Sequence, residues 1–214
     1  MYRLSAGRGA VKRIHTPRAG AFSPGFLCRC AFLEFKNPGL EDPACGAAYS
    51  NIRMEIRAAT PDDVPAVIPM VRKICALHES WDPAKYTFRS DPGEMYRAWL
   101  GRRATDQRSV FLVAERSPGP PPVLAGFLVA TVEAEIPIYR VDEFGFIHDL
   151  WVEEAYRHEG LGRQMVMLAI ERFREIGVEQ IRLDTAGANE VARALFASCG
   201  FRVSTMEMLV ELKT

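Results

Sequence analysis

The hydrophobic pattern of the chain changes at Met54. From there onward, apolar residues recur at every second position or at every third and fourth, whereas residues 1–53 show no sustained period. Alternating or continuous apolar runs predict strands over 54–59, 109–116, 122–135, 144–152, 178–185 and 205–212. Helical spacing predicts helices that follow Thr60 and that cover 91–103, 161–177 and 189–200. The order of these elements predicts a mixed α/β domain.

Polar residues and glycines mark the ends of the predicted helices. Thr60 and Asp91 each precede a proline, as an N-cap precedes proline at the first helical position. Asn189 is placed to cap the last helix. Gly177 and Gly200 follow the last two helices, where glycine accepts the left-handed backbone of a C-terminal cap.

Composition separates the first 53 residues from the rest. They are rich in Gly, Pro, Ala and Arg and contain no acidic residue before Glu34. This favours a disordered tail, or upstream sequence translated from a start placed too early, with Met54 as the alternative start. An organelle transit peptide is the other interpretation. We therefore expect an N-terminal extension over 1–53 and a folded domain over 54–214.

Charge and cysteine content argue against several classes of protein. Residues 54–214 carry 19 basic and 24 acidic residues, a net charge of −5, which is not typical of nucleic-acid binding. The longest uncharged apolar run, 123–132, is shorter than the roughly 20 residues that span a bilayer. The five cysteines lack the paired spacing of a metal site, so we expect no metal. Their odd number and scatter favour reduced thiols and a cytoplasmic location.

One segment has the form of a phosphate-binding loop. Residues 153–165, EEAYRHEGLGRQM, place Gly160 and Gly162 at the start of a predicted helix, with Arg157 three residues before the first glycine. The first amides of a helix have no intrahelical partner, and the helix dipole adds positive charge, so this position favours an anion. Glycine lets the anion approach the backbone, and arginine adds charge-assisted hydrogen bonds. An ordinary strand-to-helix turn is the alternative.

A second segment gives this loop a context. Residues 189–201, NEVARALFASCGF, follow the next predicted strand. The two segments together resemble the GNAT superfamily of acyl-CoA-dependent N-acetyltransferases, over about residues 54–214 in element order. The residues that match its pyrophosphate loop and its second motif are Arg157, Gly160, Gly162, Asn189, Ala192, Leu195, Gly200 and Phe201. The resemblance implies a GNAT-like α/β (mixed α+β) fold: a central mixed, twisted sheet of about six to seven strands, with a splayed parallel pair and about four helices on both faces.

The resemblance also implies acetyl-CoA as the cofactor. Its pantetheine arm would pair with the backbone of Trp151 and Val152, and Asn189 would contact it. Glu159 is a departure, because the family often has a basic or amide side chain there. The residues implied to hold the diphosphate are Arg157, His158, Gly160, Leu161, Gly162 and Arg163.

The strand over 144–152 carries the candidate catalytic residues. Transfer to an amine needs a base, because an alkyl ammonium has a pKa near that of lysine, about 10.4. His148 and Asp149 interrupt the apolar run, and on a regular strand they point to opposite faces. The resemblance implies that the base lies on this strand, at His148, with Asp149 as the second candidate. The alternatives are structural: a hydrogen-bonded buried histidine, and an aspartate that accepts from backbone amides.

The resemblance leaves the general acid open. The family usually protonates the departing thiolate from a tyrosine in the last helix, where this chain has Phe196. Ser198 or Cys199 could replace that tyrosine. A thiol of pKa about 8.5 is also a fair leaving group unaided.

We expect the acceptor to be held by the segments 78–88 and 133–144. Acidic and aromatic residues together suit a cationic amine, although a solvated acidic loop is the alternative. The candidate substrate residues are Trp81, Tyr86, Glu133 and Tyr139. The leading hypothesis is an N-acetyltransferase for a small amine, with no nucleic-acid or membrane partner and with a homodimer kept as a candidate assembly. The alternatives are a CoA-binding module with little or no catalysis, and a protein N-terminal or lysine acetyltransferase.

Overall fold

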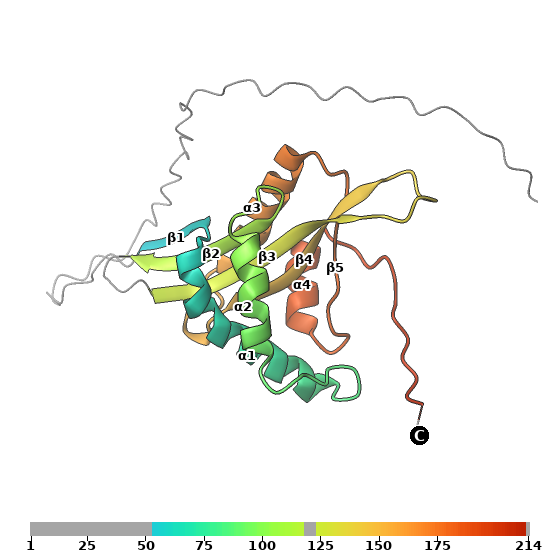
Figure 1. Ribbon diagram of the computed structural model, residues 1–214, viewed down its shortest axis with the longest axis horizontal. Helices are drawn as coiled ribbons and strands as arrows, with labels where there is room; N and C mark the ends of the chain where they lie inside the picture. Colours follow the sequence, from blue (N-terminus) through green and yellow to red (C-terminus); the bar gives the residue numbers. More distant parts are fainter. Residues whose placement is uncertain (1–52, 118–122, 213–214) are drawn as a thin grey trace, which may run out of the picture. The chain divides into compact units, whose positions relative to one another are not determined.

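The structure, a computed structural model, describes residues 53–117 and 123–212 (Figure 1). In chain order, their strands and α-helices are β1 (Arg53–Ala58), α1 (Val64–Trp81), α2 (Pro92–Arg103), β2 (Val110–Ser117), β3 (Val123–Ala134), β4 (Glu143–Val152), α3 (Leu161–Ile176), β5 (Ile181–Leu183) and α4 (Glu190–Ser198). Short 3-10 turns, Pro61–Asp63 and Glu154–Tyr156, precede α1 and α3. The extension predicted over 1–53 lies outside the described residues, except for Arg53.

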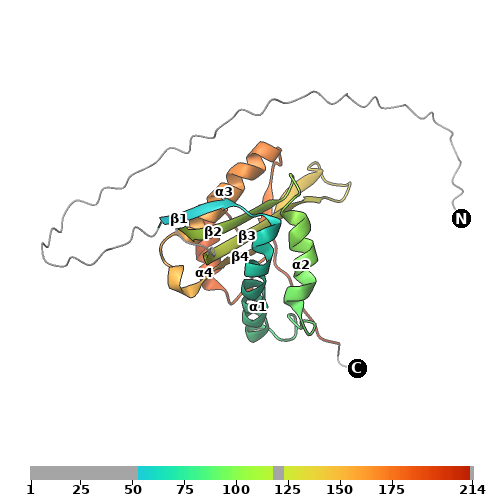
Figure 2. The same cartoon turned by 60° about the vertical axis from the view of Figure 1, so that its left-hand side comes forward.

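The described strands form one mixed sheet in the order β1-β2-β3-β4-β5. The first four are antiparallel neighbours, and β5 runs parallel to β4. Helices α1 and α2 cover one face, and α3 and α4 cover the other (Figure 2). Each face has its own apolar core: Val67, Ile68 and Leu100 pack on the α1/α2 face, whereas Met165 and Phe173 pack on the α3/α4 face. This confirms the predicted GNAT-like architecture of helices on both faces.

Strands β4 and β5 separate soon after they meet. Their pairing joins Gly145–Ile147 to Ile181–Leu183, after which β4 continues to Val152. Within the described residues, no strand lies beside this second half of β4 on its β5 side. The separation is the predicted splay of the parallel pair.

Side-chain caps set the starts of α2 and α4 as expected, whereas Thr60 precedes a 3-10 turn and its hydroxyl donates to Asp63. Asp91 accepts a hydrogen bond from the Glu94 amide at 3.0 Å. Asn189 accepts from the Ala192 amide at 3.1 Å. Gly177 ends α3 with φ 94°, a left-handed backbone that favours glycine.

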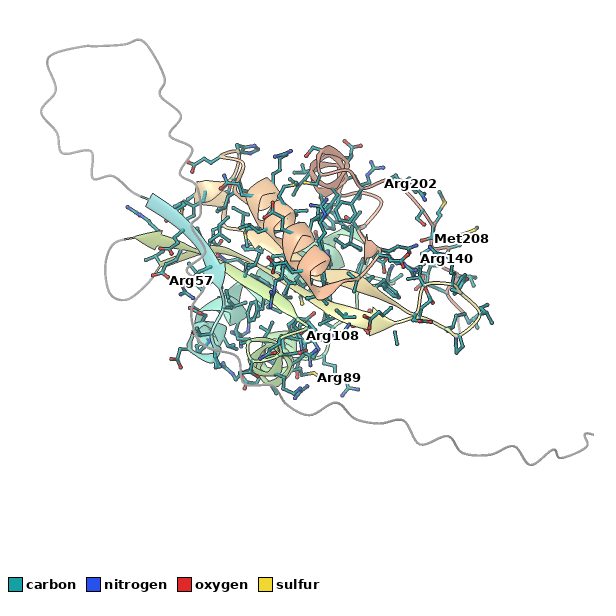
Figure 3. All side chains as sticks on the ribbon, turned by 90° about the horizontal axis from the view of Figure 1, so that it is seen from above. Arg57, Arg89, Arg108, Arg140, Arg202 and Met208 are labelled. Carbon is teal, nitrogen blue, oxygen red and sulfur yellow. The ribbon has the colours of Figure 1, made fainter. Side chains whose placement is uncertain are left out.

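The strand predicted over 205–212 is wrong. These residues form no regular secondary structure, and the apolar side chains that would define its buried face are exposed: Met206 84%, Met208 90%, Val210 76% and Leu212 87%. Figure 3 labels Met208 on this segment. An alternating pattern defines an apolar face but supplies no neighbouring strand, and a ladder needs both. The described sheet therefore has five strands rather than six to seven.

Candidate active site

The candidate phosphate loop turns sharply before α3. His158 (φ 67°) and Gly160 (φ 77°) both adopt a left-handed backbone, and Gly160 is the N-cap of α3. Among the residues that the structure describes, none accepts a hydrogen bond from the backbone amides of residues 158–163. Six consecutive amides at the positive end of a sixteen-residue helix are thus available to an external acceptor. This arrangement fits the diphosphate of acetyl-CoA.

The two glycines of the loop have different surroundings. The backbone at position 160 has a positive φ, which favours glycine there. Gly162 lies within α3, where an added Cβ would approach Leu195 Cδ2 at 3.4 Å and Val152 Cγ2 at 3.7 Å. Both distances are ordinary van der Waals contacts, so the packing of α3 against α4 and β4 does not by itself require glycine at position 162.

The charged residues of the loop are arranged unevenly. Arg157 donates from Nε to the Val152 carbonyl at 2.9 Å, and its guanidinium lies 4.8 Å from the centroid of the Trp151 ring. Its two terminal nitrogens donate to no residue in the described part of the chain. Arg163 and Glu159 are both exposed. Arg157 is therefore anchored to β4 by one nitrogen and keeps two for an anion.

The backbone of β4 alternates between β3 and the open side. The Glu153 amide donates to the Ala125 carbonyl on β3 at 2.8 Å. By the alternation of a strand, the Trp151 backbone also faces β3, while the backbones of Leu150 and Val152 face the splay. The pairing predicted between pantetheine and the backbone of Trp151 and Val152 requires groups that face the splay. Val152 and Leu150 have this orientation, whereas Trp151 does not.

Two residues of α4 are committed to structure. The Asn189 side-chain oxygen caps α4, which leaves only its NH₂ group for a ligand. Phe196 is 8% exposed, and its ring centroid lies 5.5 Å from that of Phe201. The usual tyrosine position is therefore occupied by a core aromatic residue.

A β-bulge lies at the centre of β4. Val129 of β3 is opposite Asp149, and the next residue, Ala130, is opposite Ile147. His148 is thus an extra residue with no partner in the ladder. A bulge breaks the alternation of side chains and redirects them.

Because of the bulge, His148 and Asp149 lie on the same face of the sheet. The His148 ring is edge-on to Trp99 of α2, with the centroids 5.1 Å apart. The Tyr96 hydroxyl, one turn earlier on α2, donates to Asp149 Oδ2 at 2.9 Å. The expectation that the two side chains point to opposite faces is wrong, since it assumed a regular strand.

His148 is held by a hydroxyl and a carboxylate from β3. Its Nε2 lies 2.6 Å from Thr131 Oγ1, which in turn donates to Glu133 Oε1 at 2.5 Å. The direct distance from Nε2 to Glu133 Oε1 is 3.6 Å. Thr131 is 2% exposed, whereas the side chains of His148 and Glu133 are 25% and 46% exposed. Burial lowers the pKa of His148, and Glu133 opposes this by raising it.

Asp149 has poorer surroundings for a charge. Tyr96 is its hydrogen-bond partner among the described side chains. Burial raises the pKa of Asp149 to about 6, against a smaller lowering by Tyr96. Burial, followed by the charge of Asp149, raises the pKa of the nearby Cys75 thiol to about 11. Cys75 is therefore an unreactive thiol at neutral pH.

The structure brings one of the four candidate substrate residues to His148 and Asp149. Glu133 contacts the His148 network. Trp81 and Tyr86 instead pack around His78, with ring centroids 5.4 and 4.8 Å from it. Tyr139 is 56% exposed on the turn between β3 and β4. No described contact joins these three aromatic residues to His148.

Ion pairs reduce the acidity of the segment between β3 and β4. Glu135 pairs with Arg182 at 2.5 Å, and Glu143 pairs with Arg108. Glu133 has no cationic partner among the described Lys and Arg side chains. Glu133 is therefore the acid of this segment best placed to attract a cation near His148.

Three further findings on the described residues concern a surface depression, metal binding and membrane spanning. An open depression of about 540 Å³ lies between α1 and residues 88–92, with Cys75 and Arg89 among its lining residues. Within residues 53–117 and 123–212, no cluster of His, Cys, Asp and Glu is arranged to hold a metal. None of the helices described is long and apolar enough to cross a bilayer.

Three residues that contact His148 or Asp149 were not predicted from the sequence: Thr131, Tyr96 and Trp99. Thr131 is a polar residue within the apolar run of β3, as His148 is within that of β4, so the sequence contained a sign of its role. Tyr96 and Trp99 are one helical turn apart on α2, a spacing that many structural aromatic pairs share.

Comparison with known proteins identifies the family of this chain. The model of the Acetyltransferase (GNAT) family matches residues 74–201, more than half of the chain. Mycothiol acetyltransferase from Sanguibacter keddieii is 33% identical over 163 residues, which cover 70% of this chain and 50% of that protein. The chain spans about half the length of the curated relatives it matches.

Solved structures share the fold. A mutant protein from Bacillus halodurans superposes with a TM-score of 0.64 at 21% identity, covering 74% of this chain and 99% of that chain. An aminoglycoside N-acetyltransferase in complex with CoA superposes with a TM-score of 0.55 at 14% identity, covering 78% and 100%. At these identities the likeness shows the fold alone.

Proposed function

The chain belongs to the acetyltransferase (GNAT) family, and from that premise we propose that it transfers an acetyl group from acetyl-CoA to an amine, with His148 as the general base. The observation that carries this proposal is the position of His148. It is the bulged residue of β4, partly exposed and hydrogen-bonded at Nε2, so its other ring nitrogen is left for a proton.

Acetyl-CoA would supply the acyl group as a thioester. The amides of residues 158–163, together with Arg157 and Arg163, would hold its diphosphate. The backbone of Leu150 and the amide of Val152 would pair with its pantetheine arm, whereas the Val152 carbonyl already accepts from Arg157. A backbone amide on this edge, such as that of Leu150, is also the natural donor to the thioester oxygen.

His148 would remove one proton from the acceptor ammonium, which frees the lone pair of the nitrogen for attack on the acyl carbon. As the C–N bond forms and the C–S bond breaks, the nitrogen loses a second proton, which the departing thiolate of CoA takes up. Burial lowers the pKa of His148 below the ordinary value of about 6.5, so the ring is neutral at pH 7 and can accept a proton. Trp99 and Phe146 lie edge-on to the ring, with centroids 5.1 and 5.0 Å away, and restrict its orientation.

The proposed acceptor is a small amine that is cationic in solution. Glu133 is half-exposed and adjoins His148, so its negative charge would attract an ammonium group to the neighbourhood of the His148 ring. Asp149 is less open to an ammonium group, because its carboxyl is buried and Tyr96 donates to one of its oxygens.

The test is release of free CoA from acetyl-CoA with a panel of small amines and a peptide N-terminus, using the wild-type protein and His148→Gln. We expect turnover with at least one small amine and a loss of about 10²-fold or more in kcat/KM in the variant. CoA binding, measured by calorimetry, should be unchanged, since His148 lies outside the phosphate loop.

Three results would contradict all or part of the proposal. CoA binding without turnover of any amine would indicate a CoA-binding module. Turnover restricted to the peptide would indicate a protein acetyltransferase. Full activity of His148→Gln would remove the base assignment while leaving the family reaction in place.

A further inference from the structure

We propose that Thr131 and Glu133 act as positioning residues that keep a proton on His148 Nε2 and so make Nδ1 the nitrogen that receives the substrate proton. This inference rests on the proposed function of His148. It concerns how β3 sets the protonation state of a residue on β4.

The direction of the hydrogen bonds follows from the donors available. A carboxylate only accepts, so the single hydroxyl proton of Thr131 is donated to Glu133 over 2.5 Å. Thr131 Oγ1 then meets His148 Nε2 at 2.6 Å as an acceptor. The nitrogen must therefore carry the hydrogen, and the lone pair of the neutral ring lies on Nδ1.

The surroundings favour this single arrangement. Thr131 is 2% exposed, so water does not compete for its hydroxyl. The bulge directs His148 toward Thr131, and the edges of Trp99 and Phe146 limit rotation of the ring. Leaving the buried Thr131 hydroxyl without a hydrogen bond would cost free energy. The orientations of Thr131, His148 and Glu133 are therefore coupled.

Charged and titratable groups around His148 come from three elements. Glu133 on β3 raises the pKa of His148, and Arg103 on α2 lowers it. Tyr96 on α2 and Asp149 on β4 are paired with each other. Since burial is the largest influence and lowers the pKa, Glu133 keeps His148 more basic than burial alone would allow.

The direct test is an NMR titration of the full chain without acetyl-CoA or amine. The chain has four histidines, so the His148 signals are assigned by their loss in His148→Gln. We expect neutral His148 to be protonated at Nε2. Glu133→Gln should lower its pKa by about half a unit to one unit, because a nearby negative charge is removed.

A matched control is available on the same segment. Glu135 is two residues from Glu133 but pairs with Arg182, so Glu135→Gln should leave the pKa of His148 within about 0.2 units of the wild-type value. Thr131→Val should make the Nε2 proton exchange with water at least about tenfold faster, and Thr131→Ser should restore slow exchange.

Kinetics give a second readout. Thr131→Val should lower kcat by about tenfold with little change in KM, whereas Thr131→Ser should recover most of it. A proton on Nδ1 of neutral His148 would overturn the proposal. It would also be overturned if Glu133→Gln and Glu135→Gln shifted the pKa equally, or if Thr131→Val raised KM alone.

The NMR result does not depend on acetyl transfer. The proposed roles of Thr131 and Glu133 can therefore be confirmed in a protein that turns over no amine. They can also be refuted while His148→Gln still abolishes turnover. Failure of this inference and failure of the proposed function are thus separate outcomes.

Discussion

His148 and Asp149 are neighbours on β4 and face the same helix, yet their surroundings differ in what they do to a proton. His148 meets a hydroxyl backed by a half-exposed carboxylate, and burial lowers its pKa. Asp149 meets one phenol, and burial raises its pKa to about 6. Position on the strand is therefore a weaker guide to a catalytic role than the partners that each side chain acquires.

The largest expected effect separates the two residues by activity. His148→Gln should lower kcat/KM by about 10²- to 10³-fold, because it removes the base, while Asp149→Asn should lower it by less than about tenfold. Steady-state kinetics over a range of amine concentrations, with saturating acetyl-CoA, would measure both. The reverse order of losses would transfer the base role to Asp149.

The pH dependence of kcat/KM should follow His148. A base must be unprotonated, so activity should fall about tenfold per pH unit below the pKa of His148. Burial lowers that pKa, so the fall should begin at a lower pH than the ordinary value of about 6.5. Asp149→Asn should retain this limb, and its persistence in His148→Gln would argue against the assignment.

Asp149 should instead control how stability depends on pH. Its folded pKa of about 6 lies above the unfolded value near 3.9, so the folded state binds the proton more tightly. This contribution is present below about pH 4 and is lost as the pH rises through about 6. Asp149→Asn should therefore raise the free energy of unfolding by about 1–2 kcal/mol at pH 8 and leave it nearly unchanged at pH 4.

Urea unfolding at the two pH values would measure this difference. A gain of similar size at pH 4 would show that asparagine packs better for reasons unrelated to charge.

The smallest expected effect concerns Tyr96. Tyr96→Phe removes the donor to Asp149 and should destabilise the protein by about 1 kcal/mol at pH 8, where the carboxylate is ionised. Tyr139→Phe is the matched control, because that side chain is exposed and should change stability by less than about 0.5 kcal/mol. Equal effects would mean that the Tyr96–Asp149 bond contributes nothing measurable.

Much of the fold could be predicted because its signals are local. Caps at Asp91 and Asn189 and the glycine after α3 define helix ends within a few residues of sequence. Strands β2, β3 and β4 carry their own apolar patterns. The strand over 205–212 failed for a different reason: alternation describes one segment, whereas a ladder depends on a second segment that the pattern does not identify.

The candidate site likewise has a part with local sequence signals and a part that depends on how two strands align. The loop before α3 could be predicted, since its glycines, its arginine and the helix start are contiguous in sequence. The His148 network could not, because a bulge depends on how β3 and β4 align, and one unpaired residue moves a side chain to the other face. Thr131 and Tyr96 gain their roles only through that alignment.

The bulge also means that His148 occupies a place the sheet does not need. Without residue 148, Ile147, Asp149 and Leu150 would keep the faces they already have, since Val129 and Ala130 are already opposite Asp149 and Ile147. In evolutionary terms, a strand of this kind can acquire a proton acceptor by inserting a single codon, with no core residue exchanged. If His148 is the base, as we propose, the reaction and the scaffold can change independently, because His148 has no partner in the ladder.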